Sequence, residues 1–298
     1  MVVLIDGRRF WRRGRRWLAG ITAALLLAFG LGGRFFAAPT GAAVADAGIA
    51  VPIVMYHSLY EKGQGQYVIS PALFEQDLCY LKENGYETVT VADLIAYVDK
   101  GTALPQKPVM LTFDDGFYNN FYYAHPLLQQ YGMRAVLSPI GAVSQFYSDH
   151  PEEQDKPAYS YVTFDQLRQM AASGVWEIQN HSYDMHHNQS GKRHGAARQA
   201  GESEADYART LTDDLTAAQT LLAEQAGVTP TAFTYPFGAY SAASQPVLKA
   251  LGLRASLSCE QRTSRITRDP ESLWRLGRYL RPAGVDSATF FQTRLEKE

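Results

Sequence analysis

The sequence predicts an α/β fold, a distorted (β/α) barrel of seven to eight strands that occupies residues 49–298. Three observations lead to this prediction. Apolar, strand-like runs alternate with helix-like segments about eight times along the chain. Three clusters of polar or turn-forming residues each follow directly after one of those runs. At 298 residues the chain is also long enough for a barrel that forms one domain.

The elements follow from short-range signals. Strands are expected where short apolar runs are bounded by turn-forming residues, at 51–57, 87–91, 109–113, 135–140, 175–180, 232–235, 255–258 and 274–280. Helices are expected where apolar residues recur at helical spacing between caps, at 71–84, 92–100, 117–131, 164–173, 204–226, 245–251 and 287–295. Ser70 is an N-cap, and Thr163 forms a capping box with Gln166. Residues 141–162 are expected to form a loop at the rim.

Residues 1–48 differ from the rest and are predicted to be a targeting segment. Six arginines between Arg8 and Arg16 precede residues 17–33, which carry no charge and are rich in Leu and Ala. This is the pattern of a signal peptide or an uncleaved signal anchor. The arginines should stay in the cytoplasm. The domain of residues 49–298 is therefore expected outside the cytoplasmic membrane, anchored to it or secreted after cleavage.

Charge and cysteine content bear on the binding partners and on possible disulfides. Residues 1–45 hold seven Arg and one Asp, which leaves 21 basic and 29 acidic residues, a net charge of −8, in the rest of the chain. Such an acidic domain binds phosphate backbones poorly, so no nucleic-acid partner is expected. Cys79 and Cys259 lack metal-type spacing, and a disulfide or two free thiols are both open. A monomer is expected.

The most informative motif is Thr-Phe-Asp-Asp-Gly at residues 112–116, which follows the apolar run 109–111. Two carboxylates, Asp114 and Asp115, therefore end a buried strand. Burying them side by side is tolerated when a cation lies there or when one of them holds a proton. The alternative is structural, because Asp115 and Gly116 precede a helix-like segment and could cap its free N–H groups.

A histidine cluster follows the strand-like run 175–180. His181, His186 and His187 lie within seven residues. Imidazole is the commonest protein ligand for borderline metals, and an Asp with two His leaves coordination positions open, as a catalytic metal needs. A histidine-rich loop without function is the alternative. Residues five apart on a helix diverge by about 140°. His181 and His186 can therefore share an ion only if residues 182–185 form a non-helical turn. His187 is then expected to point away from the ion or to contact one of its ligands without binding the ion itself.

The third motif follows the strand-like run 232–235 and consists of Tyr235, Pro236, Phe237, Gly238 and Tyr240. Its proline and glycine force a sharp turn and expose backbone N–H groups. Its aromatic rings suit the apolar faces of sugars, and an ordinary aromatic-rich turn is the alternative. His57 also ends a strand-like run, and it either lines the same site or is a satisfied histidine at the rim.

These three motifs, with the opening run Val-Pro-Ile-Val-Met-Tyr-His-Ser at 51–58, resemble the successive motifs of the polysaccharide deacetylases, the NodB-homology domain of carbohydrate esterase family 4. The resemblance covers residues 50–295. It implies a metal-dependent hydrolase that removes N-acetyl groups from amino sugars of a cell-surface or extracellular polysaccharide. Peptidoglycan, chitin-like polymers and poly-N-acetylglucosamine all present such groups.

Residue by residue, the resemblance implies that Asp115, His181 and His186 bind a divalent metal, expected to be Zn²⁺, although Co²⁺, Ni²⁺ or Mn²⁺ suit the same ligands. It implies that Asp114 is the general base. The backbone N–H of Phe237 would hold the developing oxyanion. Contacts with the substrate are expected from the remaining residues of the third motif and the first strand, Tyr235, Pro236, Tyr240 and His57.

The sequence departs from the family pattern in three places. Thr234 stands where the family often carries an arginine that orients the base. No histidine follows His194, so the general acid is not assigned, and Arg275, Arg278 or a water are the candidates. The two ligand histidines are five apart, where four is common.

Two other functions remain open. A glycoside hydrolase would use two carboxylates in the same barrel, but adjacent residues at one strand end are poorly placed to flank a glycosidic bond. A catalytically impaired, carbohydrate-binding relative of the deacetylases fits the missing histidine and Thr234. Asp114, however, has no use in binding alone.

Overall fold

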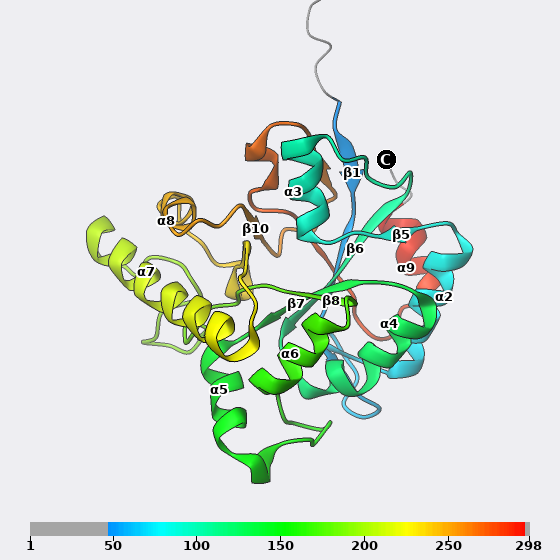
Figure 1. Ribbon diagram of the computed structural model, residues 1–298, viewed down its shortest axis with the longest axis horizontal. Coiled ribbons are helices and arrows are strands. Elements are labelled where there is room, and N and C mark those ends of the chain that lie inside the picture. The colour runs from blue at the N-terminus through cyan, green and yellow to red at the C-terminus, as the bar shows by residue number, and fades with distance from the viewer. Residues whose placement is uncertain (1–46, 296–298) are drawn as a thin grey trace, which may run out of the picture. The chain divides into compact units, whose positions relative to one another are not determined.

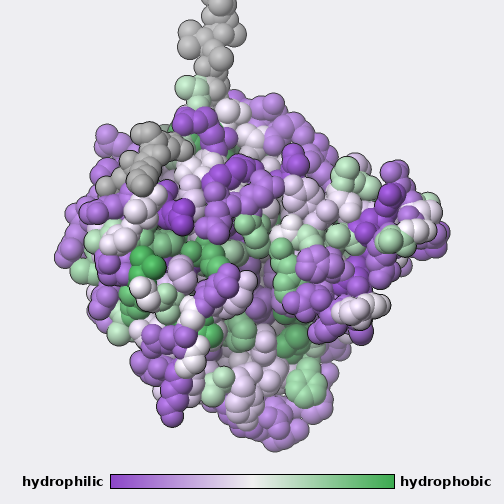
Figure 2. All heavy atoms as spheres, turned by 180° about the vertical axis from the view of Figure 1, so that it is seen from behind, coloured by the Kyte–Doolittle hydropathy of each residue, from purple (hydrophilic) through white to green (hydrophobic). Residues whose placement is uncertain are grey.

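The computed structural model describes residues 47–295 (Figure 1). The predicted targeting segment, residues 1–48, lies outside the described residues except for its last two. Within residues 47–295, no helix is both long enough and apolar enough to cross a membrane. The face seen in Figure 2 is mostly hydrophilic, with hydrophobic residues scattered between the polar ones.

The fold is built on a parallel sheet. Its strands, in spatial order, are β12 (Tyr279–Leu280), β2 (Ile53–Tyr56), β6 (Pro108–Asp115), β7 (Ala135–Pro139) and β8 (Trp176–Ile178), and β5 (Glu87–Thr88) pairs with the start of β6. A second parallel pair comprises β9 (Ala232–Thr234) and β10 (Ala255–Leu257). This confirms the expected α/β class with a parallel sheet.

Isolated bridges connect the two groups of strands. Asn180, just after β8, pairs in parallel with Phe233 of β9, and Leu257 of β10 pairs in parallel with Leu276, shortly before β12. The strand path therefore runs from β8 through β9 and β10 back towards β12, an arrangement consistent with a distorted barrel. The connections from β8 to β9 and from β10 towards β12 are single bridges, because the strands on that side are short.

Helices flank the strands in Figure 1. They are α2 (Pro71–Glu83), α3 (Val91–Lys100), α4 (His125–Tyr131), α5 (Gly141–Asp149), α6 (Phe164–Ala172), α7 (Glu204–Leu221), α8 (Ser244–Ala250) and α9 (Ser287–Arg294). The predicted caps are present. The Ser70 side chain accepts a hydrogen bond from the Leu73 N–H, and Thr163 and Gln166 form the capping box of α6.

Two regions differ from the sequence-based expectation. The expected loop 141–162 begins with helix α5. Its first N–H groups, at Gly141 and Ala142, donate to the carbonyls of Ser182 and Tyr183, so a tertiary contact replaces a local cap. A short antiparallel pair, β1 (Ile49–Val51) with β11 (Ser264–Ile266), was also not expected, and the last predicted strand, 274–280, shrinks to β12.

Side chains of β6 and β7 are buried on both faces of the sheet. Leu111 and Leu137 belong to one hydrophobic cluster, whereas their neighbours Met110 and Val136 belong to another. Strands of a parallel sheet that are covered on both faces read as continuous apolar runs, as these do. The sides of the strands are therefore occupied by core, and the carboxyl ends are the part left open for a site.

Candidate active site

The three sequence motifs meet at the carboxyl ends of neighbouring strands. Asp114 and Asp115 end β6, the histidine cluster follows β8, and the Pro236–Gly238 turn follows β9. Together they line a cavity of about 620 Å³. Its wall includes His57, Asp114, Asp115, His181, His186 and Phe237.

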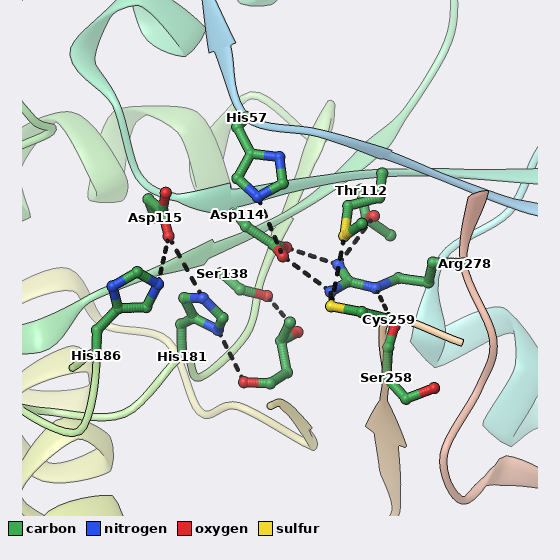
Figure 3. Close-up of polar contacts among 12 residues, drawn as sticks. His57, Thr112, Asp114, Asp115, Ser138, His181, His186, Ser258, Cys259 and Arg278 are labelled. Carbon is green, nitrogen blue, oxygen red and sulfur yellow. Dashed lines mark hydrogen bonds and ion pairs between the residues drawn. The ribbon is translucent and has the colours of Figure 1, made fainter. Parts of the chain in front are cut away.

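Asp115, His181 and His186 face one point (Figure 3). The Nε2 atoms of His181 and His186 lie 3.4 and 3.2 Å from Oδ1 of Asp115, and one ligand atom from each residue lies within 4.8 Å of the others. Helical residues begin at Tyr118, but the Asp115 side chain faces His181 and His186 and does not cap that segment, since among the described residues its Oδ1 accepts no hydrogen bond. The capping alternative is therefore wrong.

These three side chains suit a divalent metal. Oδ1 of Asp115 is buried and has no hydrogen-bond partner in the part of the chain that the structure describes. Nδ1 of His181 lies 2.8 Å from the Thr234 carbonyl, which can only accept, so Nδ1 carries the proton and Nε2 is free as a ligand. Burial alone would raise the pKa of Asp115, but His181 and His186 outweigh it and hold that pKa below its ordinary value. One carboxylate and two imidazoles are an open donor set for zinc or a similar metal.

The turn between the two histidines is not helical, which explains how residues five apart converge. Ser182 has a left-handed backbone, with φ 79°. The N–H groups of Tyr183 and Asp184 each donate to the carboxylate of Asp214 on α7, at 2.8 Å. His187 points elsewhere and contacts Asp184 at 3.5 Å. Asp214 had no sequence signal as a supporting residue, because it lies in the middle of a helix thirty residues further along the chain.

Left-handed backbone conformations concentrate at the site. Asp115, Ser182 and Phe237 have φ values of 70°, 79° and 58°. A non-glycine residue in this region costs about 1–3 kcal/mol and persists only where the surrounding structure fixes it. Here the conformation turns the chain sharply at the end of β6, after His181 and in the turn after β9. The backbone strain therefore lies at the residues that orient the candidate metal ligands and the backbone N–H of Phe237.

Asp114 has a cationic partner that sequence reasoning missed. Arg278, fully buried, donates from its two terminal nitrogens to the two carboxylate oxygens of Asp114, at 2.6 and 2.8 Å. Its Nε donates to the carbonyl of Ser258 at 2.8 Å. The arginine expected at position 234 is thus not missing from the site but comes from the segment before β12. Thr234 instead forms a 2.8 Å hydrogen bond with Ser138.

The charge state of Asp114 follows from this pair. Burial alone would raise the pKa of Asp114, but Arg278 and then His181 outweigh it and keep that pKa below its ordinary value. The carboxylate therefore remains ionised inside the site. Arg278 is fully engaged with Asp114 and the Ser258 carbonyl, so it is not suited to donate a proton.

His57 lines the site next to Asp114. Its Nε2 lies 4.0 Å from Oδ2 of Asp114, and its ring packs edge-on against Tyr67. Its Nδ1 is buried and has no hydrogen-bond partner within residues 47–295, so the alternative of a satisfied rim histidine is wrong. Burial, the largest effect, lowers the pKa of His57 despite the nearby carboxylates.

The third motif is placed differently from the expectation in three residues. Tyr235 and Pro236 are buried, and Tyr240 is turned to Glu260, to which its hydroxyl donates at 2.8 Å. None of the three is among the residues that line the cavity. They support the turn instead, because Tyr235 packs in the cluster beneath it. Phe237 is the exposed ring, 38% accessible, and it lies over His186 with ring centroids 4.3 Å apart.

Cys79 and Cys259 are free thiols, so the disulfide alternative is wrong. Cys79 lies on α2 and contacts Glu83. Cys259 lines the cavity and lies 3.8 Å from Arg278.

A parallel α/β fold that gathers an ionised Asp and an Asp-His-His set at its strand ends offers the groups of a hydrolase site. The chain belongs to the polysaccharide deacetylase family, whose family model, described as "Polysaccharide deacetylase", matches residues 101–256. This agrees with the resemblance found in the motifs.

Among characterised relatives, the chain is 27% identical over 218 residues to the poly-beta-1,6-N-acetyl-D-glucosamine N-deacetylase of Escherichia coli (strain K12), which covers 67% of this chain and 32% of that protein. It is 26% identical over 196 residues to the enzyme of the same name from Staphylococcus aureus (strain MRSA252), with 66% of this chain and 62% of that protein covered. The chain thus spans between about a third and two thirds of the length of these relatives.

A similar fold occurs in a de-N-acetylase from Aggregatibacter actinomycetemcomitans. The two structures match with a TM-score of 0.67 and 26% sequence identity, over 81% of this chain and 98% of that one.

Proposed function

We propose that the protein is a metal-dependent N-deacetylase that acts on amino sugars of a cell-surface or extracellular polysaccharide. One observation carries the proposal. Asp115, His181 and His186 converge beside an ionised, fully buried Asp114 in the same cavity. This combination offers a metal site and a separate base within reach of one substrate group.

The residues divide the work of amide hydrolysis. When bound by Asp115, His181 and His186, the metal would polarise the acetyl carbonyl and activate water as a nucleophile. Asp114 would accept the proton of that water, since Arg278 keeps its carboxylate ionised. The backbone N–H of Phe237, set by the strained turn, would hold the developing oxyanion.

His57 is the best candidate for the general acid that the sequence left unassigned. Its Nε2 lies 4.0 Å from Oδ2 of Asp114, and burial favours its neutral form, so it would take up the proton that Asp114 removes from water. His57 would then pass a proton to the leaving amine. A His57→Gln variant should therefore bind metal normally and lose most of its turnover, typically about 100-fold or more for a general acid or base.

The proposed metal is Zn²⁺, with Co²⁺, Ni²⁺ or Mn²⁺ as alternatives that the same ligands accept. Elemental analysis of the purified protein identifies the ion. Reconstitution of chelated protein with each ion in turn identifies the one that supports turnover.

The substrate would present the acetamide to this cavity, with sugar faces against the exposed rings of Phe237 and Tyr67. Peptidoglycan, chitin-like polymers and poly-N-acetylglucosamine are the candidates. The test is acetate release from a panel of these polymers, with and without chelator. Full activity of a demonstrably metal-free preparation would refute the proposal.

Neither rival is favoured by the site. The carboxylates among the described residues that line the cavity are Asp114 and Asp115, both at the end of β6, which does not suit the opposed carboxyl groups of a glycosidase. A binding protein without activity has no need of the Asp114–Arg278 pair. Product analysis separates the three functions. A glycosidase creates new reducing ends, a deacetylase releases acetate, and a binding protein does neither.

We also propose that residues 1–48 hold the domain on the outer side of the cytoplasmic membrane or direct its export. The support is the arginine block followed by an uncharged run in the sequence. Recovery of full-length protein from the soluble cytoplasm of its native cell would contradict this. A monomer is proposed, and light scattering of the purified domain tests it.

A further inference from the structure

We infer that the loop of residues 187–203, which we name the basic loop, forms an anion-binding subsite next to the active-site cavity. The preferred substrate is then an acidic aminoglycan, one that carries a carboxylate or phosphate on a sugar close to the acetylated one. This inference rests on the proposed deacetylase function, because it refines which polymer enters the same site.

The basic loop encloses a hollow of its own, about 470 Å³ in volume. Lys192, His194 and Arg198 contribute to its wall, and no carboxylate is among the described residues that line it. The domain that carries this hollow has a net charge of −8 over residues 46–298. The hollow is therefore lined by basic side chains although the domain as a whole is acidic.

Much of that positive charge is available to a ligand. Arg193 is neutralised within the loop, because it binds both carboxylate oxygens of Glu202 at 2.9 and 2.5 Å. Arg198 lies 3.7 Å from Glu204, whose side chain is 80% exposed, and such a surface pair is weak. Lys192 has no ion-pair partner among residues 47–295. Glu202, which is already bound by Arg193, also interacts electrostatically with Arg198. An anion in the hollow would therefore compete with Glu204 and Glu202 at Arg198, whereas at Lys192 it would meet no paired carboxylate among the described residues.

The hollow adjoins the catalytic cavity through a shared wall. The ring of Phe237 lies nearly parallel to that of His194, 5.4 Å away at 19°, and also contacts His186 at 4.3 Å. Asn188, from the same basic loop, lines the catalytic cavity. A polymer with one sugar at the metal site would therefore place its neighbour close to Lys192 and Arg198.

The basic loop is held in place, which suits a preformed subsite. Gly195 donates to the His187 carbonyl at 2.9 Å and has a φ of 51°. A Cβ at Gly195 would lie 2.4 Å from the carbonyl oxygen of Pro236, so the loop is pressed against the turn that carries Phe237. The Arg198 N–H also donates to the Ser241 hydroxyl at 2.9 Å.

The test compares acetylated oligosaccharides of equal length that are neutral, carboxylate-bearing or phosphate-bearing. For the unchanged protein, kcat/KM should be higher on one or both acidic oligosaccharides than on the neutral one. In the double variant Lys192→Gln/Arg198→Gln, the ratio of acidic to neutral kcat/KM should fall about tenfold, since two exposed charge contacts are lost. The fall should come from KM and shrink at high salt. The two acidic arms identify which anion the subsite takes.

Lys100→Gln/Lys107→Gln is the matched control, because it also removes two charges, from the end of α3 and the segment before β6, and neither residue lines either hollow. It should leave the ratio unchanged. An unchanged ratio in the double variant, or a fall of equal size in the control, would overturn the subsite. The subsite would also be overturned if the double variant lost binding to anionic lipid vesicles while its ratio of acidic to neutral kcat/KM stayed the same.

Calorimetric titration of the acidic oligosaccharide separates this inference from the proposed function. If no polymer releases acetate but the double variant still binds the acidic oligosaccharide about tenfold more weakly, the subsite stands and the proposed reaction fails. If acetate is released equally from neutral and acidic polymers, and binding does not change in the double variant, the reaction stands and the subsite fails.

Discussion

Replacing Arg278 by Met should both destabilise the protein and impair Asp114, its proposed base. Arg278 and Asp114 form a fully buried pair with two short contacts, 2.6 and 2.8 Å. Removing one partner of a buried pair leaves the other charge uncompensated, which typically costs about 3–5 kcal/mol. For a domain of this size that corresponds to a fall in Tm on the order of 10 °C. Thermal and denaturant unfolding measure the loss.

The same substitution should move the pH dependence of turnover. Arg278 holds the pKa of Asp114 low, so the base is ionised in the wild-type protein well below neutral pH. Without Arg278, burial dominates and the pKa of Asp114 rises. The carboxylate is then protonated over a wider acidic range, and the acidic limb of the kcat/KM profile should shift to higher pH. Arg278→Lys, which keeps the charge but loses the two-pronged contact, should fall between Met and the wild type.

The double variant Arg278→Met/Asp114→Asn supplies the decisive comparison. Since the uncompensated charge is gone, it should recover part of the stability that Arg278→Met loses. If the loss of unfolding free energy in the double variant equals the sum of the losses in the two single variants, the residues are not coupled. That result would refute the role assigned to Arg278.

Three further outcomes follow from the site. Asp114→Asn should keep metal bound and lose about 100-fold or more in kcat, whereas Asp115→Asn should lose metal affinity; equal metal loss in both would reverse the assigned roles. His186→Ala should weaken metal binding far more than His187→Ala in a metal titration, because only the first faces the cluster. Gly195→Ala should lower kcat/KM without unfolding the domain, since the new Cβ must push the basic loop from the turn that it touches; unchanged kinetics would show that the loop does not support the site.

The parallel α/β class and most helices were predictable because their signals are local. An apolar run such as residues 109–111 indicates a strand buried on both faces. The capping box of Thr163 and Gln166 indicates the start of a helix. Helix α5 was missed for the opposite reason. Its N-terminus is satisfied by the carbonyls of Ser182 and Tyr183, which are about forty residues away in sequence and leave no local mark.

The sequence alone predicted that Asp114, Asp115, His181 and His186 gather at one site, since carboxylates at a strand end and clustered histidines are costly to place without a use. Tertiary structure decided how they work together. Only the closing of the strand path brings Arg278 to Asp114, across 164 residues of chain, and sets His57 beside the same carboxylate. Pairing over such separations depends on the packing of the whole core, so no motif around Thr234 could reveal that its expected arginine would come from the segment before β12.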